Sequence, residues 1–264
     1  MGKKILIIGD TIVDRDINLR AVGLSLESPT LKTCITGESV SFGGAANVAK
    51  FAHLFGAEVS FITCMSEDSA TLFLSKHDIK LINVNKDVEN IKTRFYVKHG
   101  DATYKYLQVN SIDTQLESLH SDKHPIECLN PICFSGYDLI AISDYRCGLV
   151  TDGLIDKIAD SEYLTFGASQ LSDKQSNLHK YSKLNYIVCN KDESKTINRK
   201  DNVVITDGKN GCELNGIHYP AFGVSDGKKI IGAGDCFYAA FLTYDDIEQA
   251  NKAAFEYIEG KYGD

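Results

Sequence analysis

Short apolar runs alternate with helix-like patterns along most of the chain. Continuous apolar runs, each ending in polar or small residues, occupy residues 3–10, 58–64, 79–84, 137–143, 185–189 and 202–208. Apolar residues at helical spacing occupy residues 43–56, 69–77, 151–160 and 245–264. The first set predicts buried strands and the second predicts helices. This alternation predicts an α/β fold, in which helices flank a mostly parallel sheet and cover both faces of its strands.

Residues 92–100 and 104–110 instead alternate between apolar and polar positions around a polar turn. This pattern predicts an antiparallel hairpin, with Phe95 and Val97 on an exposed edge strand. With the extended stretch near residues 15–40, the hairpin is expected to form a small accessory sheet over one edge of the main sheet. Because no repeat or low-complexity linker interrupts the chain, residues 1–264 are interpreted as one domain.

Composition and charge restrict the class of partner. The chain has 43% hydrophobic and 24% charged residues, as soluble globular proteins do. Its net charge of −8 without a long basic run argues against nucleic acid as the main partner, whereas a phosphorylated small molecule needs only a few local donors. No apolar run is long enough to span a membrane, and the short run near the N-terminus lacks a cleavage site. The eight cysteines form no CxxC pair, so we expect reduced thiols in a cytoplasmic protein.

Polar residues follow several of the predicted strands. In parallel sheets, ligands bind beyond the carboxyl ends of the strands. The polar residues at these ends are Asp10, Asp14, Ser143, Asp144, Asn190, Thr206 and Asp207. The sequence therefore predicts a binding site at this edge of the sheet.

In the stretch IIGAGDCFYAAF, residues 230–241, three small residues stand directly before one acidic residue. At Gly232, Ala233 and Gly234 the backbone N–H groups can converge, and the following helix adds the positive end of its dipole. The pattern predicts an anion site, beside which Asp235 can accept a proton from a hydroxyl nucleophile. The alternative is a glycine turn in which Asp235 only caps the helix.

Two further motifs lie near predicted strand ends. Gly43 and Gly44 let a ligand approach the backbone, and Asn47, one helical turn later, can hydrogen-bond hydroxyl groups. Asp14, in GDTIVD after the first strand, is suited to binding a pair of sugar hydroxyls. The alternatives are tight packing of the helix on the sheet and an aspartate in a turn. The glycine motif is neither a Walker loop nor a GxGxxG sequence.

The order of these motifs, with N-x-x-E and VITDG between them, resembles the ribokinase-like (PfkB) family of carbohydrate kinases over nearly the whole chain. The variants GDTIVDR, ESP, GGAANVA and SDY are most similar to the D-glycero-D-manno-heptose-7-phosphate kinase branch. The resemblance implies a three-layer fold with a small β-lid near residues 15–40 and 92–110. It also implies Mg²⁺-dependent transfer of the γ-phosphoryl group of ATP to a hydroxyl of a sugar or sugar phosphate, with a heptose 7-phosphate as the best match.

The resemblance also implies roles for individual residues. Asp235 corresponds to the catalytic base, and Gly232, Ala233 and Gly234 correspond to the anion hole. The residues implied in substrate binding are Asp14, Gly43, Gly44, Asn47, Arg94 and Asp144. Those implied in nucleotide binding are Asn190, Glu193, Thr206 and Gly208, with Glu193 associated with Mg²⁺. Lys92 and Arg94 either meet a sugar phosphate or form a solvated face of the lid.

Several positions depart from the family pattern. Lys229 stands where many members carry an acid that helps to hold a monovalent cation, Gly167 stands in place of an aspartate, and Cys147 stands in place of a lysine. Only nine residues, 194–202, join Glu193 to the next strand, where the family has a helix. Nine extended residues reach about 30 Å, so a return to a parallel neighbour is feasible but tight.

These observations leave more than one function open. The first interpretation is an active sugar kinase, and a homodimer through the lid is expected. Another is a kinase for a different sugar or a nucleoside. A third is a degenerate homologue that binds sugar or nucleotide without catalysis, which the departures favour and the retained site residues oppose.

Overall fold

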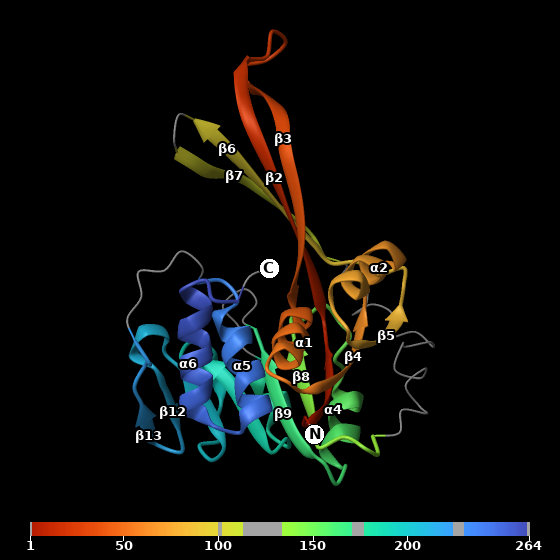
Figure 1. Ribbon diagram of the computed structural model, residues 1–264, viewed down its shortest axis with the longest axis vertical. Helices are drawn as coiled ribbons and strands as arrows, with labels where there is room; N and C mark the ends of the chain where they lie inside the picture. The colour runs from red at the N-terminus through yellow and green to blue at the C-terminus, as the bar shows by residue number, and fades with distance from the viewer. Residues whose placement is uncertain (1, 100–101, 113–133, 171–176, 224–229, 263–264) are drawn as a thin grey trace.

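The computed structural model describes residues 2–99, 102–112, 134–170, 177–223 and 230–262 (Figure 1). Its main sheet has nine strands in the order β13-β12-β11-β10-β9-β8-β1-β4-β5. Neighbouring strands from β11 to β5 pair in parallel, whereas β12 and β13 are antiparallel. The strands are β1 Lys4–Gly9, β4 Glu58–Cys64, β5 Lys80–Asn85, β8 Leu139–Asp144, β9 Leu164–Ser169, β10 Tyr186–Asn190, β11 Val203–Thr206, β12 Cys212–Leu214 and β13 Ile217–Tyr219. The predicted α/β fold with a mostly parallel sheet is confirmed.

Helices cover both faces of this sheet. They are α1 Ala45–Leu54, α2 Glu67–Lys76, α4 Asp152–Ala159, α5 Ala233–Tyr244 and α6 Ile247–Ile258, with short 3₁₀ turns η2 Leu178–Tyr181, η3 Glu193–Thr196 and η4 Gly208–Asn210. In β1, Ile5 and Ile7 pack in the core with α1, α5 and α6, while Leu6 and Ile8 pack in the core with α4 and η2. All four side chains are fully buried, and each such burial contributes about 1.5–3 kcal/mol. Burial on both faces is the reason why this strand is an unbroken apolar run.

A second sheet projects from the body of the molecule (Figure 1). Its strands are β2 Thr11–Leu24, β3 Leu31–Gly44, β6 Ile91–His99 and β7 Ala102–Ser111, in the order β3-β2-β6-β7. The extended stretch and the hairpin thus form one accessory sheet, as predicted. The expected edge position of Phe95 and Val97 is wrong, because β6 is an inner strand and Val97 is only 7% exposed. The edge strands are β3 and β7, and the side chains of β7 are exposed along its length.

The accessory sheet is tied directly to the carboxyl edge of the main sheet. Strand β2 begins at Thr11, two residues after β1, and β3 ends at Gly44, where α1 begins. In the paired strands Asp14 lies opposite Ser41 on one side and Lys92 on the other. The sheet therefore carries polar side chains of β2 and β6 to the predicted site.

The sequence patterns missed three strands of the main sheet. Strand β9 contains Gly167 and lacks a long apolar run, and β12 and β13 have three residues each. The short connection after Glu193 does return to a parallel neighbour, because β10 and β11 pair in parallel with only η3 and an extended segment between them. Among the described residues, no helix has the length and apolarity needed to cross a membrane. The cysteines in the described ranges are free thiols.

Candidate functional site

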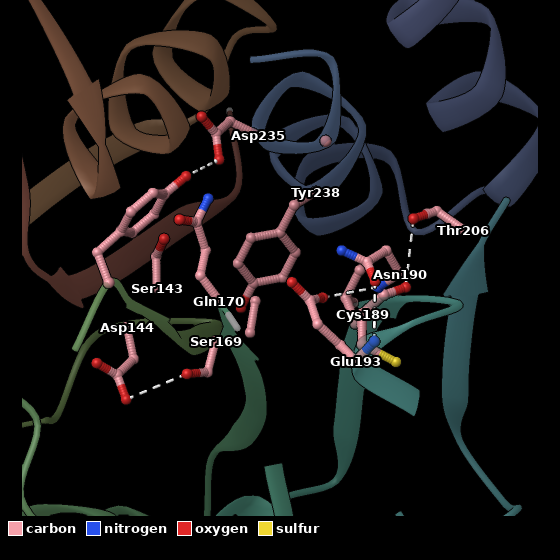
Figure 2. Close-up of a pocket in the computed structure, with 14 residues that line it drawn as sticks. Ser143, Asp144, Ser169, Gln170, Cys189, Asn190, Glu193, Thr206, Asp235 and Tyr238 are labelled. Carbon is pink, nitrogen blue, oxygen red and sulfur yellow. Dashed lines mark hydrogen bonds between the residues drawn. The ribbon is translucent and has the colours of Figure 1, made fainter. Parts of the chain in front are cut away.

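Two cavities meet at the N-terminal turn of α5. The sheet cavity, of about 140 Å³, lies over the ends of β8, β9, β10 and β11 and includes Asn190, Glu193 and Thr206 in its lining (Figure 2). The hairpin cavity, of about 170 Å³, lies between β2, β3, α1 and β6 and includes Asp14 and Asn47. The residues that line both cavities are Tyr145, Gln170, Gly234 and Asp235. A ligand in one cavity would therefore meet a ligand in the other at Asp235.

The carboxylate of Asp235 is held by two donors at this junction. Tyr145 donates its hydroxyl to Oδ1 at 2.6 Å, and Asn47 donates Nδ2 to Oδ2 at 3.2 Å. Burial raises the pKa of Asp235 to about 6, while these two hydrogen bonds oppose the rise. The group is thus ionised at neutral pH and basic enough to accept a proton, which suits a general base.

The N-terminus of α5 presents backbone amides beside this carboxylate. Gly232 precedes the helix with φ of 93°, and a side chain there would come within 2.7 Å of the Tyr257 hydroxyl. The N–H groups of Gly234 and Asp235 lie in the first turn and have no intrahelical acceptor. A Cβ added at Gly234 would meet no atom within 4 Å, because this glycine faces the cavities. These features form a cradle for an anion.

The double glycine makes room for the carboxylate of Asp14. A Cβ at Gly43 would lie 2.6 Å from Asp14 Oδ2, and Gly44 adopts a positive φ of 65° with no space beside the carbonyl oxygen of Asp10. Arg94 Nη1 lies 2.8 Å from Asp14 Oδ1 and 3.6 Å from Asp16 Oδ1. Burial raises the pKa of Asp14, and Arg94 opposes this change.

The guanidinium of Arg94 is therefore already balanced by two carboxylates. Arg94 also lines the hairpin cavity, so its expected contact with a sugar phosphate stays a prediction. Lys92, on the same strand, also lines the hairpin cavity.

The N-x-x-E motif forms a reciprocal turn at the end of β10. The Asn190 side chain accepts from the amide of Glu193 at 2.9 Å, and Glu193 Oε2 accepts from the amide of Asn190 at 2.8 Å (Figure 2). This arrangement matches a capping box, so local structure alone explains the spacing. Glu193 is nonetheless 8% exposed and lines the sheet cavity.

The sheet cavity fits Mg²⁺ as nucleotide sites commonly do, with few protein ligands and the remaining positions filled by water and phosphate oxygens. The described residues contain no group of three His, Cys, Asp or Glu side chains able to hold a metal. Mg²⁺ commonly binds through one or two carboxylates together with water and substrate phosphates, and Glu193 offers one carboxylate. Thr206 lines the same cavity, whereas Gly208 lies beyond it in η4.

Two acids at strand ends, Asp10 and Asp144, have structural partners. Asp144 is 1% exposed and accepts hydrogen bonds from Tyr181 and from Asn177, with Lys180 Nζ at 3.1 Å. Asp144 nevertheless lines the sheet cavity, so its expected role in substrate binding stays a prediction. Asp10 accepts three backbone N–H groups of residues 145–149, and burial, followed by the charge of Asp144, raises its pKa to about 7.

The departures from the family pattern lie mostly outside the site. Gly167, which the resemblance sets in place of an aspartate, is buried within β9, where a Cβ would lie 2.9 Å from Leu184. The part of this segment that lines the sheet cavity is residues 168–170. Cys147 is 1% exposed and does not line either cavity. Lys229 lies outside the described residues.

Sequence reasoning did not assign a role to Tyr145, Asp16 or Gln170. Tyr145 directly follows a predicted strand end, and Asp16 follows Asp14 at the two-residue spacing of one strand face. These positions offered a signal for the first two. No sequence pattern distinguished Gln170, because β9 was not predicted.

Comparison with solved structures confirms the ribokinase-like fold. The chain is similar to a nucleoside kinase of Methanocaldococcus jannaschii, described as an archaeal member of the ribokinase family, with a TM-score of 0.65 and 20% identity over 96% of this chain and 90% of that one. It is also similar to a carbohydrate kinase from Agrobacterium tumefaciens, with a TM-score of 0.67 and 14% identity over 99% and 92%. For the ribokinase of Thermotoga maritima the TM-score is 0.61, with 17% identity over 95% and 89%.

Sequence comparison finds relatives that match only part of the chain. The chain is 26% identical over 160 residues to the bifunctional protein HldE of Nitratiruptor sp., covering 57% of this chain and 33% of that protein. It is 26% identical over 203 residues to HldE of Sulfurimonas denitrificans, covering 72% and 40%. The chain thus spans well under half the length of these curated relatives. No family model matches the chain.

Proposed function

We propose that this protein is an ATP-dependent carbohydrate kinase of the ribokinase-like family. The observation that carries the proposal is the position of Asp235: a carboxylate with a pKa of about 6 lies beside the amide cradle of α5, at the junction of two cavities. Phosphoryl transfer needs an acceptor hydroxyl, a donor phosphate and a base at one point. The fold shared with known kinases supports the same proposal.

In this proposal the sheet cavity receives the triphosphate and the hairpin cavity receives the acceptor. Asp235 accepts the proton of the acceptor hydroxyl, which attacks the γ-phosphorus while the bond to the leaving ADP oxygen breaks. The amides of Gly234 and Asp235 stabilise charge on the transferring group. Asp14 binds acceptor hydroxyls, held in place by Arg94. Glu193, with Asn190, would hold Mg²⁺ through its water shell, and that ion would neutralise phosphate charge.

The acceptor is proposed to be a sugar phosphate, best matched by a heptose 7-phosphate. The similarity to HldE proteins and the resemblance of GDTIVDR and GGAANVA support this branch. A recess of about 560 Å³ continues from the hairpin cavity and includes Asp16, Lys50 and Tyr96, which leaves room for an acceptor longer than a pentose. A second candidate is a nucleoside acceptor, favoured by the aromatic and aliphatic part of this recess, Tyr96, Ile230 and Ile231.

The accessory sheet is proposed to act as a lid over the acceptor, in a single-domain protein that works in the cytoplasm. Lys92 and Arg94 reach the hairpin cavity from β6, so closure of the sheet would move both toward a bound sugar.

The experiment is a measurement of ADP release from MgATP across a panel of sugars, sugar phosphates and nucleosides. We expect one class to be phosphorylated, with Asp235→Asn lowering kcat by roughly two to four orders of magnitude and leaving ATP affinity nearly unchanged. A binding measurement with MgATP and each panel member separates the degenerate alternative. Binding without turnover in the wild type would support that alternative and contradict the proposal.

A further inference from the structure

We infer that Tyr145 is a positioning residue for Asp235, which holds Oδ1 and thereby leaves Oδ2 to receive the proton of the acceptor. Its relevance to catalysis rests on the proposed function, but the contact itself does not. Tyr145 Oη donates to Oδ1 at 2.6 Å, the shorter of the two hydrogen bonds to this carboxylate. Oδ2 is bonded by Asn47, which lines the hairpin cavity but not the sheet cavity. Because the hydroxyl of Tyr145 engages Oδ1, proton acceptance is assigned to Oδ2, the oxygen on the side of Asn47.

The main chain of Tyr145 is itself fixed to the end of β1. Its amide donates to Asp10 Oδ2 at 2.9 Å, and the amides of Cys147 and Leu149 donate to the same carboxylate at 3.2 and 3.3 Å. Between them Arg146 adopts a positive φ of 61°, with its amide donating to Asp144 at 2.7 Å. Hydrogen bonds to several amides of this turn fix the backbone of Tyr145. The phenol ring therefore has a defined position from which its hydroxyl can hold Asp235.

The hydroxyl of Tyr145 remains a donor at every pH at which a kinase assay is run. Burial and then the charge of Asp235 raise the pKa of Tyr145 well above its ordinary value of 10. The other groups that act on Asp235 come from elements packed around it: Asn47 and Lys50 of α1 favour its ionised form, and Asp14 of β2 disfavours it. Among the groups that favour the carboxylate over the acid, the hydrogen bond from Tyr145 has the largest effect on the pKa of Asp235.

Removal of this hydroxyl should therefore change Asp235 in a way that a packing defect would not. In Tyr145→Phe the ring stays and the hydrogen bond to the charged form is lost. Because the lost hydrogen bond favours the charged form, the pKa of Asp235 should rise by about one pH unit or more. The freed carboxylate should also rotate, which lowers kcat by roughly tenfold or more while the KM for MgATP changes little.

The matched control is Tyr238→Phe. Tyr238 lies three residues further along α5, is buried, and donates its hydroxyl to the carbonyl oxygen of Ile142 at 3.0 Å. Its loss removes one buried hydrogen bond from the same helix without a contact to Asp235. It should lower thermal stability and leave the pKa of Asp235 unchanged.

The test is a ¹³C NMR titration of aspartate carboxyl groups in the full-length protein, with the Asp235 signal assigned from Asp235→Asn. The wild type, Tyr145→Phe and Tyr238→Phe are titrated without ligand, so the result does not depend on turnover. A higher pKa of Asp235 in Tyr145→Phe alone supports the inference. An unchanged pKa in Tyr145→Phe, or an equal change in both variants, overturns it.

Kinetics then connect the contact to the reaction. With an acceptor from the panel, the acid limb of the kcat profile of Tyr145→Phe should move to higher pH by the change measured in the titration. If the wild type phosphorylates no acceptor, the proposed kinase activity fails while the titration still decides the contact. If turnover occurs and kcat of Tyr145→Phe equals that of the wild type, the positioning role is wrong.

Discussion

Replacement of Asp235 by asparagine should make the protein more stable at neutral pH while it removes the proposed base. The carboxyl of Asp235 has a pKa of about 6 in the folded protein, against 3.8 for the ordinary group. Burial is the main cause of the raised pKa, so ionisation of Asp235 destabilises the folded state. Asparagine has nearly the same shape and keeps an oxygen for the Tyr145 hydroxyl, but it carries no charge to desolvate.

The magnitude follows from the linkage between protonation and folding. The pKa of the Asp235 carboxyl is higher in the folded protein than in the unfolded chain. Its contribution to the free energy of unfolding is therefore fully present below about pH 3.8 and is lost as pH rises through about 6. A difference of about two pH units corresponds to about 3 kcal/mol at roughly 1.4 kcal/mol per unit. Asp235→Asn should therefore be up to about 3 kcal/mol more stable than the wild type at pH 7.5, with about half of this gain at pH 5.

Urea unfolding at pH 7.5, 5 and 4, with m-values compared between proteins, measures this difference. The control is Asp207→Asn. Asp207 receives hydrogen bonds from Lys191 and Asn210, which lower its pKa, so its replacement should bring no gain in stability at pH 7.5. A loss of stability in Asp235→Asn at pH 7.5, or a gain of equal size at all three pH values, would refute the argument that burial of the charge causes the raised pKa.

Three further results are expected. Gly234→Ala should keep the thermal stability of the wild type, since no atom lies within 4 Å of the added Cβ, but weaken MgATP binding in calorimetry at least tenfold; unchanged affinity would show that the cradle holds no phosphate. Activity should not respond to K⁺ at constant ionic strength, because Lys229 stands where the resemblance to ribokinase-like kinases implies a cation-holding acid; activation of several-fold would contradict this. The protein should form a homodimer through β7, where Tyr104, Tyr106 and Leu107 are 61%, 62% and 49% exposed; a monomeric mass by light scattering at assay concentration would argue against it.

The sequence by itself determined the layers of the fold and the location of the site. A run such as Ile5–Ile8 has no polar position because both of its faces are covered, and this property is visible without coordinates. The glycines at 43, 44 and 232 and the acid at 235 could also be identified as candidate site residues from the sequence. A turn of small residues directly before a helix depends only on residues that are adjacent in the chain. The strands that escaped prediction are short or interrupted, as β9 is by Gly167.

Only the tertiary structure decided which polar side chains are open to a ligand. Asp144 and Asp235 both line the sheet cavity, but Tyr181, 37 residues away in the sequence, donates a hydrogen bond to Asp144, whereas only Asp235 also lines the hairpin cavity. Arg94 is matched to Asp14 through the parallel pairing of β2 with β6, and Tyr145 reaches Asp235 across 90 residues of sequence. The free energy of a polar side chain depends on the hydrogen-bonding and charged partners around it in the folded protein. Those partners are distant in the sequence, so a local residue pattern cannot identify them.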